Sequence, residues 1–257
     1  MKTILLKFAG PMQSWGTKSH YDQRHTDGYP SKSAVLGLIA ASLGWHRDDT
    51  RIASLNALQF AVRVDQPGHV REDYHTAHSI STITGHEGKY LAGFYEGQIK
   101  VATYITHRYY LEDAVFLVAV GSGDEKTIET ILKALKSPVF QPYMGRRSCP
   151  LPIDFLQGVV DASPLEALTH AKWQAAQWLQ KDQRRKQNCK NRLSIYADYT
   201  KDRDADYKLL NRRHDYVLSL SSKGRRYTER LEGEKVIEVE IPNMNSEHDA
   251  FGALGGE

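Results

Sequence analysis

Residues 114–138, AVFLVAVGSGDEKTIETILKALKSP, contain the pattern that decides the fold. The run 114–120 is apolar and rich in valine, which favours a buried β-strand. Ser122-Gly-Asp-Glu125 has the spacing of a capping box, the combination of a hydroxyl and a carboxylate that begins many helices. Four apolar residues then recur at helical spacing before Pro138: Ile128, Ile131, Leu132 and Leu135. This stretch therefore predicts a strand followed directly by an amphipathic helix.

An earlier part of the chain has the same order. Thr3–Phe8 is typical of a strand, and Ser31 or Ser33 can cap a following helix. A β-rich run follows at Leu58–Val64, and a last strand is expected near Phe155–Val160, after the second helix. The order strand, helix, strand, strand, helix, strand predicts an α+β fold with a ferredoxin-like (RRM-like) core in residues 1–160.

An insertion at residues 66–113 interrupts this expected core. Two β-rich runs, Val70–His78 and Ile99–Thr106, are separated by a segment with four glycines, Gly85, Gly88, Gly93 and Gly97. Two strands separated by a glycine-rich turn predict a projecting β-hairpin, or thumb.

Charge is unevenly distributed along the chain, although its net value is only +3. Residues 181–230 contain fifteen Lys/Arg and seven Asp/Glu, a local charge of +8, so the rest of the chain sums to 3 − 8 = −5. A basic segment on a near-neutral body is typical of a polyanion-binding surface, and a solvated charged face has the same composition. Residues 161–257 thus form a basic C-terminal region, whose acidic, glycine-rich end we expect to be a flexible tail.

The sequence lacks the signatures of several functional classes. No apolar run approaches the roughly 18 residues of a membrane helix, and Lys7 interrupts the short apolar N-terminus, so we expect neither a membrane span nor a signal peptide. Cys149 and Cys189 have no metal or redox spacing, which favours a reducing cytoplasm. His75 and His78 lack a third ligand at a suggestive spacing. We expect a cytoplasmic protein without a metal or another cofactor.

Four polar segments adjoin the expected elements and are candidates for binding. They are residues 10–16, 29–33, 73–76 and 142–151. In the last, Gly145 permits a close backbone approach, Arg146 and Arg147 suit phosphate recognition, and Tyr143 can stack on a base. Each residue also has a plainer explanation: Trp15 as a core anchor, Ser31 as a helix cap, or one arginine paired with a carboxylate.

Together these segments resemble one family. The motifs occur in a fixed order as Gly10-Pro-Met-Gln-Ser-Trp-Gly16, Tyr29-Pro-Ser-Lys-Ser-Ala-Val-Leu-Gly-Leu38, Arg47-Asp-Asp49, Asp73-Tyr-His-Thr76 and Pro142-Tyr-Met-Gly-Arg-Arg-Ser-Cys-Pro-Leu151. They are similar to the Cas-five family of the RAMP superfamily, in the form found in type I-E CRISPR Cascade complexes. The resemblance spans residues 1 to about 158, and the last motif is highly specific.

The resemblance implies a non-catalytic subunit of an antiviral surveillance complex. Such a subunit holds the 5′ handle of the CRISPR guide RNA and contacts the large subunit and the nearest backbone subunit. Its thumb crosses the guide, and target DNA is engaged indirectly, through base pairing with the guide. The RNA contacts expected on this basis are Gln13, Trp15, Arg24, Ser31, Lys32, His75, Tyr143, Gly145, Arg146, Arg147 and Ser148.

Two other classes of function remain open. Proteins of similar fold in other CRISPR subtypes cleave repeat RNA without a metal, which requires a base, a cation and an acid. Suitable side chains occur in two places: Lys18, His20, Tyr21 and Arg24 in one loop, and Tyr74 with His75. The type I-E-like motifs favour the non-catalytic class. A protein scaffold without RNA contact would leave the local +8 and the arginine pair unexplained.

Overall fold

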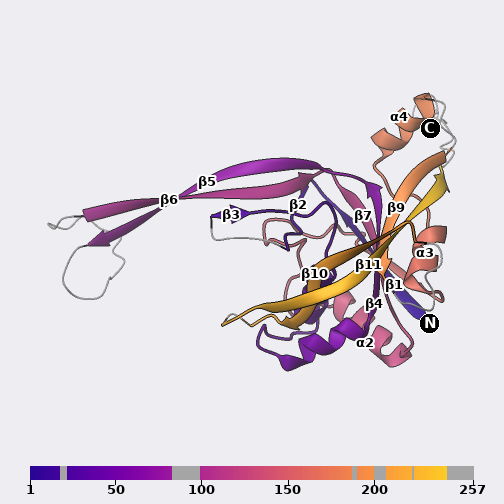
Figure 1. Ribbon diagram of the computed structural model, residues 1–257, viewed down its shortest axis with the longest axis horizontal. Helices are drawn as coiled ribbons and strands as arrows, with labels where there is room; N and C mark the ends of the chain where they lie inside the picture. The colour runs from indigo at the N-terminus through magenta and orange to yellow at the C-terminus, as the bar shows by residue number, and fades with distance from the viewer. Residues whose placement is uncertain (18–21, 83–98, 187–189, 200–206, 222, 242–257) are drawn as a thin grey trace, which may run out of the picture.

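A seven-stranded antiparallel sheet forms the centre of the computed structural model, which describes residues 1–17, 22–82, 99–186, 190–199, 207–221 and 223–241 (Figure 1). The strand order is β10-β11-β9-β4-β7-β1-β8. The strands are β1 (Lys2–Ala9), β4 (Gln59–Gln66), β7 (Val115–Ser122), β8 (Leu156–Val160), β9 (Lys190–Asp198), β10 (Leu209–Ser219) and β11 (Arg226–Glu240).

Helices cover both faces of this sheet. They are α1 (Lys32–Ser42), the 3-10 helix η1 (Thr50–Ala57), α2 (Glu125–Lys136), α3 (Pro164–His170) and α4 (Gln177–Arg185). Successive strand residues point to opposite faces, so Ile4 of β1 packs in one core cluster with α1 and α2, whereas Leu5 packs in a second cluster with α3. Burial on both faces explains why the central strand β7 has a nearly continuous apolar sequence.

The predicted α+β class is confirmed, and the predicted element order is present as β1, α1, β4, β7, α2 and β8. Ser31 caps α1, and its hydroxyl accepts a hydrogen bond from the backbone N–H of Ala34. The start of α2 differs from the capping-box prediction, because Asp124 rather than Ser122 is the N-cap. The Ser122 hydroxyl instead accepts a hydrogen bond from the N–H of Asp124, one step before the helix begins.

A long hairpin, which we call the thumb, extends away from the sheet (Figure 1). It consists of β5 (His69–Thr82) and β6 (Ile99–Glu112), both longer than the sequence predicted. Two short strands join its base to the body, β2 (Met12–Gln13) antiparallel and β3 (Gln23–Arg24) parallel to β6. The predicted turn glycines lie at residues 83–98, outside the described part of the chain.

The C-terminal strands belong to the central sheet rather than to a sheet of their own. β9 pairs with β4 of the core, and β11 and β10 extend the same sheet beyond β9. The acidic C-terminal stretch begins inside β11, while the expected tail, residues 242–257, lies outside the described residues. None of the helices in the described ranges is both long and apolar enough to cross a membrane.

Candidate nucleic-acid interface

The loop between α2 and β8 forms a tight, anchored turn. Tyr143 and Pro150 form an isolated antiparallel bridge, and the Met144 N–H donates to the Cys149 carbonyl oxygen at 2.8 Å. Met144 and Cys149 are both buried, so they fasten the two sides of the turn to the core. This leaves the residues between them, 145–148, as a preorganised tip.

Gly145 is required at this tip by both conformation and space. Its φ is +81°, a backbone region that side-chain-bearing residues rarely adopt. A Cβ atom there would lie 1.6 Å from the carbonyl oxygen of Ser14. The Ser14 N–H donates to the Met144 carbonyl oxygen at 3.2 Å, so the loop rests directly on the segment after β1. The motifs at residues 10–16 and 142–151 are therefore in contact.

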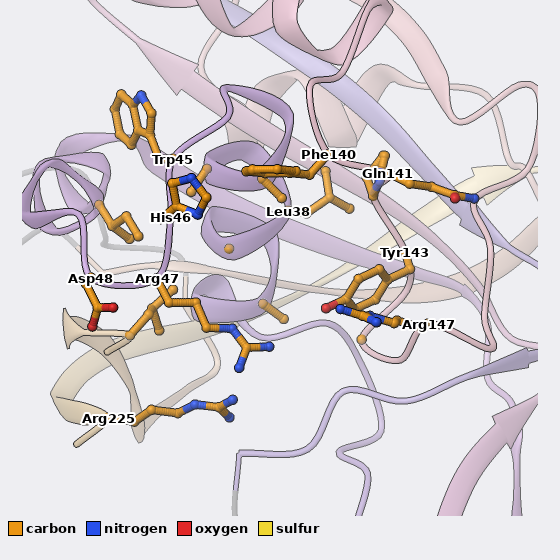
Figure 2. A pocket seen from close by; sticks show the side chains of 18 of the residues that line it. Leu38, Trp45, His46, Arg47, Asp48, Phe140, Gln141, Tyr143, Arg147 and Arg225 are labelled. Atoms are coloured by element: carbon orange, nitrogen blue, oxygen red, sulfur yellow. The ribbon is translucent and has the colours of Figure 1, made fainter. Parts of the chain in front are cut away.

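A groove of about 830 Å³ opens beside this loop, and arginines from three distant parts of the chain line it. Arg47 follows α1, Arg147 lies at the loop tip, and Arg225 immediately precedes β11. Figure 2 shows their guanidinium groups directed into the same cavity. In the described part of the chain no carboxylate pairs with any of the three. We call this cavity the arginine groove.

Aromatic side chains form much of its wall: Trp45, Phe140, Tyr143 and Tyr227. Burial raises the pKa of Tyr227, while the charges of Arg225 and Arg47 oppose this effect. Tyr227 is therefore neutral at physiological pH and keeps its O–H as a donor. The one lining carboxylate, Asp48, accepts a hydrogen bond from the Ser221 hydroxyl. Guanidinium groups beside aromatic rings are the combination that binds single-stranded nucleic acids.

A side pocket of about 390 Å³ adjoins the groove and shares Gly145 and Arg225 with it. Arg24, His25 and Arg146 also line this pocket. Arg146 Nη2 donates to the Arg24 carbonyl oxygen at 2.8 Å, and the guanidinium lies 4.4 Å from the centre of the Tyr110 ring. Arg146 thus braces the loop against β3 and the base of the thumb. The adjacent arginines have different surroundings, because Arg147 is exposed to the groove.

Two of the predicted RNA contacts, Gln13 and Trp15, are buried side chains that hold the fold. Gln13 Nε2 donates to the Ala114 carbonyl oxygen at 2.7 Å, and its Oε1 accepts from Trp15 Nε1 at 3.0 Å. The Trp15 ring packs against Phe8 with a centroid distance of 5.2 Å. These polar atoms are already satisfied, so we revise the expectation and assign both residues to the core.

Lys32 is likewise closed off from solvent, with 3% of its surface exposed. Its ammonium donates to Asp198 Oδ2 at 2.7 Å and to the Asn56 carbonyl oxygen at 3.0 Å. Its backbone N–H donates to Asp215 at 2.8 Å, so a buried protein carboxylate occupies the start of α1 where a phosphate was expected. With Ser31 acting as the cap, this helix start has a structural role.

Asp198 and Asp215 connect Lys32 to a larger buried charge network. Arg230 of β11 donates to both carboxylates, at 3.0 and 2.7 Å, and to Glu232 at 2.6 Å. Burial disfavours the charged form of Arg230, yet the surrounding carboxylates raise its pKa above the ordinary value. We call the side chains of Lys32, Asp198, Asp215, Arg230 and Glu232 the buried network.

His75 lies apart from the arginine groove, on β5 of the thumb. Its Nδ1 is buried without a hydrogen-bond partner among the described residues. Lys18, His20 and Tyr21, the possible catalytic side chains of the first loop, lie outside the described residues. Within the described ranges no group of three or more His, Cys, Asp or Glu side chains is placed to hold a metal ion. Ser148, the last predicted contact, is exposed at the loop tip.

Sequence reasoning missed two principal residues of the groove. Arg47 belongs to a motif whose residue types do not by themselves indicate binding, and Arg225 belongs to no motif. The excess of basic residues in 181–230 was a signal for Arg225, but it could not distinguish that residue from the paired Arg230. Only the folded sheet brings the turn before β11 to the loop after α2.

The chain belongs to the Cas5 family, because the family model for "CRISPR-associated protein (Cas_Cas5)" matches residues 3–230. It is 38% identical over 176 residues to the CRISPR system Cascade subunit CasD of Escherichia coli (strain K12), a match covering 64% of this chain and 75% of that protein. The family match extends well beyond residue 158, where the resemblance in sequence motifs ends, and therefore includes β9, β10 and the start of β11.

Solved structures support the same relationship. A chain of a CRISPR RNA-guided surveillance complex superimposes with a TM-score of 0.72 at 29% identity, covering 96% of both chains. A second structure, described as the crystal structure of a Cas protein, has a TM-score of 0.60 at 29% identity and covers 91% of this chain and 94% of its own. The similarity thus includes nearly the entire chain.

Proposed function

We propose that this chain is a non-catalytic subunit of a cytoplasmic CRISPR RNA-guided surveillance complex, and that its arginine groove holds the 5′ handle of the guide RNA. One observation carries the RNA-binding part: three arginines without carboxylate partners among the described residues converge on an aromatic-lined groove. Like charges gathered in one cavity repel one another, which a bound polyanion relieves. Family membership and the similarity to a chain of a surveillance complex support the assignment to such an assembly.

The groove matches a single RNA strand better than a duplex. Its arginines can grip phosphates bidentately, and its aromatic rings can stack only on bases that are not already paired. The adjoining side pocket adds Arg24 and His25, which gives the strand a continuous basic path from the groove toward the base of the thumb. We infer that the guide follows this path, with the thumb crossing it.

We further infer a ferredoxin-like, RRM-like core made of β1, α1, β4, β7, α2 and β8. The strand order β8-β1-β7-β4 and its antiparallel pairing support this assignment. The thumb is the insertion in this core, and β9–β11 extend it. In the proposed complex the chain bridges the large subunit and the nearest backbone subunit, while target DNA is recognised through the guide.

An assay for cleavage separates this proposal from the ribonuclease alternative. Purified protein is incubated with labelled repeat RNA in EDTA and, separately, in magnesium. We expect intact RNA in both conditions. Specific cleavage that persists in EDTA and disappears in a His20→Ala or His75→Ala variant would establish a metal-independent ribonuclease instead.

RNA binding is tested with the full chain carrying the three substitutions Arg47→Gln, Arg147→Gln and Arg225→Gln. A hydrogen bond to a charged group contributes about 1.5–3 kcal/mol, so loss of the three arginines should weaken binding of a repeat-derived handle RNA at least a hundredfold. Fluorescence anisotropy measures the affinity, and thermal unfolding checks that the variant is folded.

Arg212→Gln, compared with the groove variant Arg147→Gln, which also removes a single charge, provides the matched control. Arg212 is an exposed arginine of β10 that forms a long ion pair of 3.6 Å with Glu229 at the surface. The control should bind handle RNA within about twofold of the wild type, since rim charges contribute little to affinity. Equal losses in the control and the groove variant would mean that RNA responds only to net charge, and the proposed site would be rejected.

A further inference from the structure

Helix α4 is held at its start by a fully buried ion pair. Arg63 and Asp65 of β4 are paired at 2.6 Å, and neither side chain is exposed. The Arg63 guanidinium also donates to three carbonyl oxygens of the segment after α3, those of Leu168, Ala171 and Lys172. Asp65 accepts from the Gln174 N–H at 2.6 Å, and Gln66 Oε1 accepts from the Ala176 N–H at 3.0 Å. The chain leading into α4 therefore has a fixed position.

The outer face of α4 combines an aromatic ring with cations. Leu179 packs against the second core cluster, whereas Trp178 is 59% exposed. Lys181 lies three residues after Trp178, and Arg185 lies four residues after Lys181, which places all three side chains on one face. Lys181 and Arg185 are both exposed. An exposed tryptophan is uncommon at a solvent face, because burying its ring is strongly favourable.

The surroundings of this face are strongly basic. Residues 181–192 contain six Lys/Arg and one Asp, a net charge of +5. Lys186 pairs with Asp182 at 2.7 Å, and Lys190 lies 3.5 Å from Glu238 of β11. Lys181 and Arg185 have no such ion pair within the described ranges. This leaves an exposed ring flanked by two available cations.

This surface is separate from the proposed guide site. No residue of α4 lines the arginine groove or the side pocket. Figure 1 shows α4 on the side of the molecule away from the thumb strands β5 and β6, beside the start of β9. An RNA strand that runs from the groove along the thumb therefore leaves the basic face of α4 unoccupied.

We propose that the outer face of α4 binds single-stranded DNA through Trp178, Lys181 and Arg185. Given the proposed function, this DNA is the strand that is displaced when the guide pairs with its target. Base stacking on an exposed aromatic ring, together with cations that follow the phosphates, is the general mode of single-strand binding. In a duplex the faces of the bases are already stacked, so Trp178 has a partner only in an unpaired strand.

Binding of labelled oligothymidine to the full chain tests this proposal. The groove variant Arg47→Gln/Arg147→Gln/Arg225→Gln serves as the background, so that the arginine groove does not contribute. In this background Trp178→Ala should weaken binding about tenfold, the effect of losing one stacked base. Lys181→Gln/Arg185→Gln should reduce the slope of log affinity against log salt by about 1.4, since each neutralised phosphate contributes about 0.7.

Lys133→Gln/Lys136→Gln provides a matched control, because these lysines occupy the exposed last turn of α2 and remove the same charge. The control should leave both the oligothymidine affinity and the salt slope unchanged within the error of the measurement. Unchanged binding in both α4 variants, or equal losses in those variants and the control, would overturn the proposal. Equal losses of single-stranded and duplex DNA in the α4 variants would also overturn it, because stacking on Trp178 would then be irrelevant.

A second arm separates this proposal from the guide-binding site. In the otherwise wild-type chain, the α4 variants should keep handle-RNA affinity. A loss of handle RNA in these variants would make α4 part of the guide site and would contradict the proposal. If the groove substitutions leave handle RNA bound while Trp178→Ala still weakens oligothymidine binding, the proposed function fails and the role of α4 stands.

Discussion

The buried network and the arginine groove use the same residue types in opposite environments. Arg230 in the network is 9% exposed and contacts three carboxylates, so its charge is balanced within the protein. Arg225, five residues earlier, faces an open cavity and has no carboxylate partner among the described residues. Basic residues in one segment of sequence thus divide into those that hold the fold and those that remain available for a polyanion. Counting charges cannot make this division, whereas identifying the partner of each charge can.

The largest expected effect concerns the network. Arg230→Ala removes the nearest cation from the buried carboxylates of Asp215 and Glu232 and leaves them the longer contacts with Arg213, at 3.5 and 3.6 Å. Breaking a buried pair costs about 3–5 kcal/mol. We expect the free energy of unfolding to fall by this amount in chemical denaturation. Handle-RNA affinity per folded molecule should be unchanged. If the variant is as stable as Arg212→Ala, a surface substitution of the same type, the network does not have the structural role assigned to it.

The loop that supports Arg147 gives the next largest effect. Gly145→Ala introduces a Cβ against the Ser14 carbonyl oxygen at a φ of +81°. We expect a loss of about 2–3 kcal/mol, from backbone strain and from displacement of the loop. RNA affinity should fall as well, because the tip would move. Gly123→Ala is the control, since nothing lies within 4 Å of its Cβ position.

Arg146 and Arg147 allow the same comparison, between an arginine that holds the fold and one that is available for RNA, within a single loop. Arg147→Gln should weaken handle-RNA binding about tenfold and lower the salt slope by about 0.7, with an unchanged melting temperature. Arg146→Gln should also lower the melting temperature, because it removes the hydrogen bond to the Arg24 carbonyl oxygen and the contact with Tyr110. Parallel measurements of anisotropy and thermal unfolding decide the matter. The same response in both variants would contradict the assignment of Arg146 to loop support and of Arg147 to RNA binding.

A surface ion pair gives the smallest effect. The hydrogen bond from Lys7 lowers the pKa of Asp154, so this pair stabilises the fold above the unfolded carboxyl pKa, near 4. That contribution should disappear as pH falls through the lower, folded-state value. Because Asp154 is mostly exposed, Asp154→Asn should cost below about 1 kcal/mol at neutral pH and nothing at pH values below both pKa values. A loss that persists in acid would show that the ion pair is not its cause.

Much of the fold was predictable because its signals are local. The β7–α2 stretch carries a strand, a cap and an amphipathic helix in consecutive residues, and the thumb is two strands that follow one another. The position of β9–β11 was not predictable, since the pairing of β9 with β4 joins segments more than 120 residues apart. The site was only partly predictable for the same reason. Lys32 has the sequence context of a phosphate ligand. Only the folded structure shows that its ammonium forms an ion pair with Asp198 of β9.

Cross-linking offers the most direct test of the central claim, that the arginine groove holds the guide RNA handle. Handle RNA containing photoreactive 4-thiouridine is assembled into the reconstituted complex and irradiated, and the cross-linked peptides of this subunit are identified by mass spectrometry. Cross-links in the peptides that contain Tyr143 and Tyr227 are predicted, since both rings line the groove. Their loss in the Arg47→Gln/Arg147→Gln/Arg225→Gln variant would complete the result. Efficient cross-links confined to other surfaces, with the groove peptides unmodified, would contradict the account.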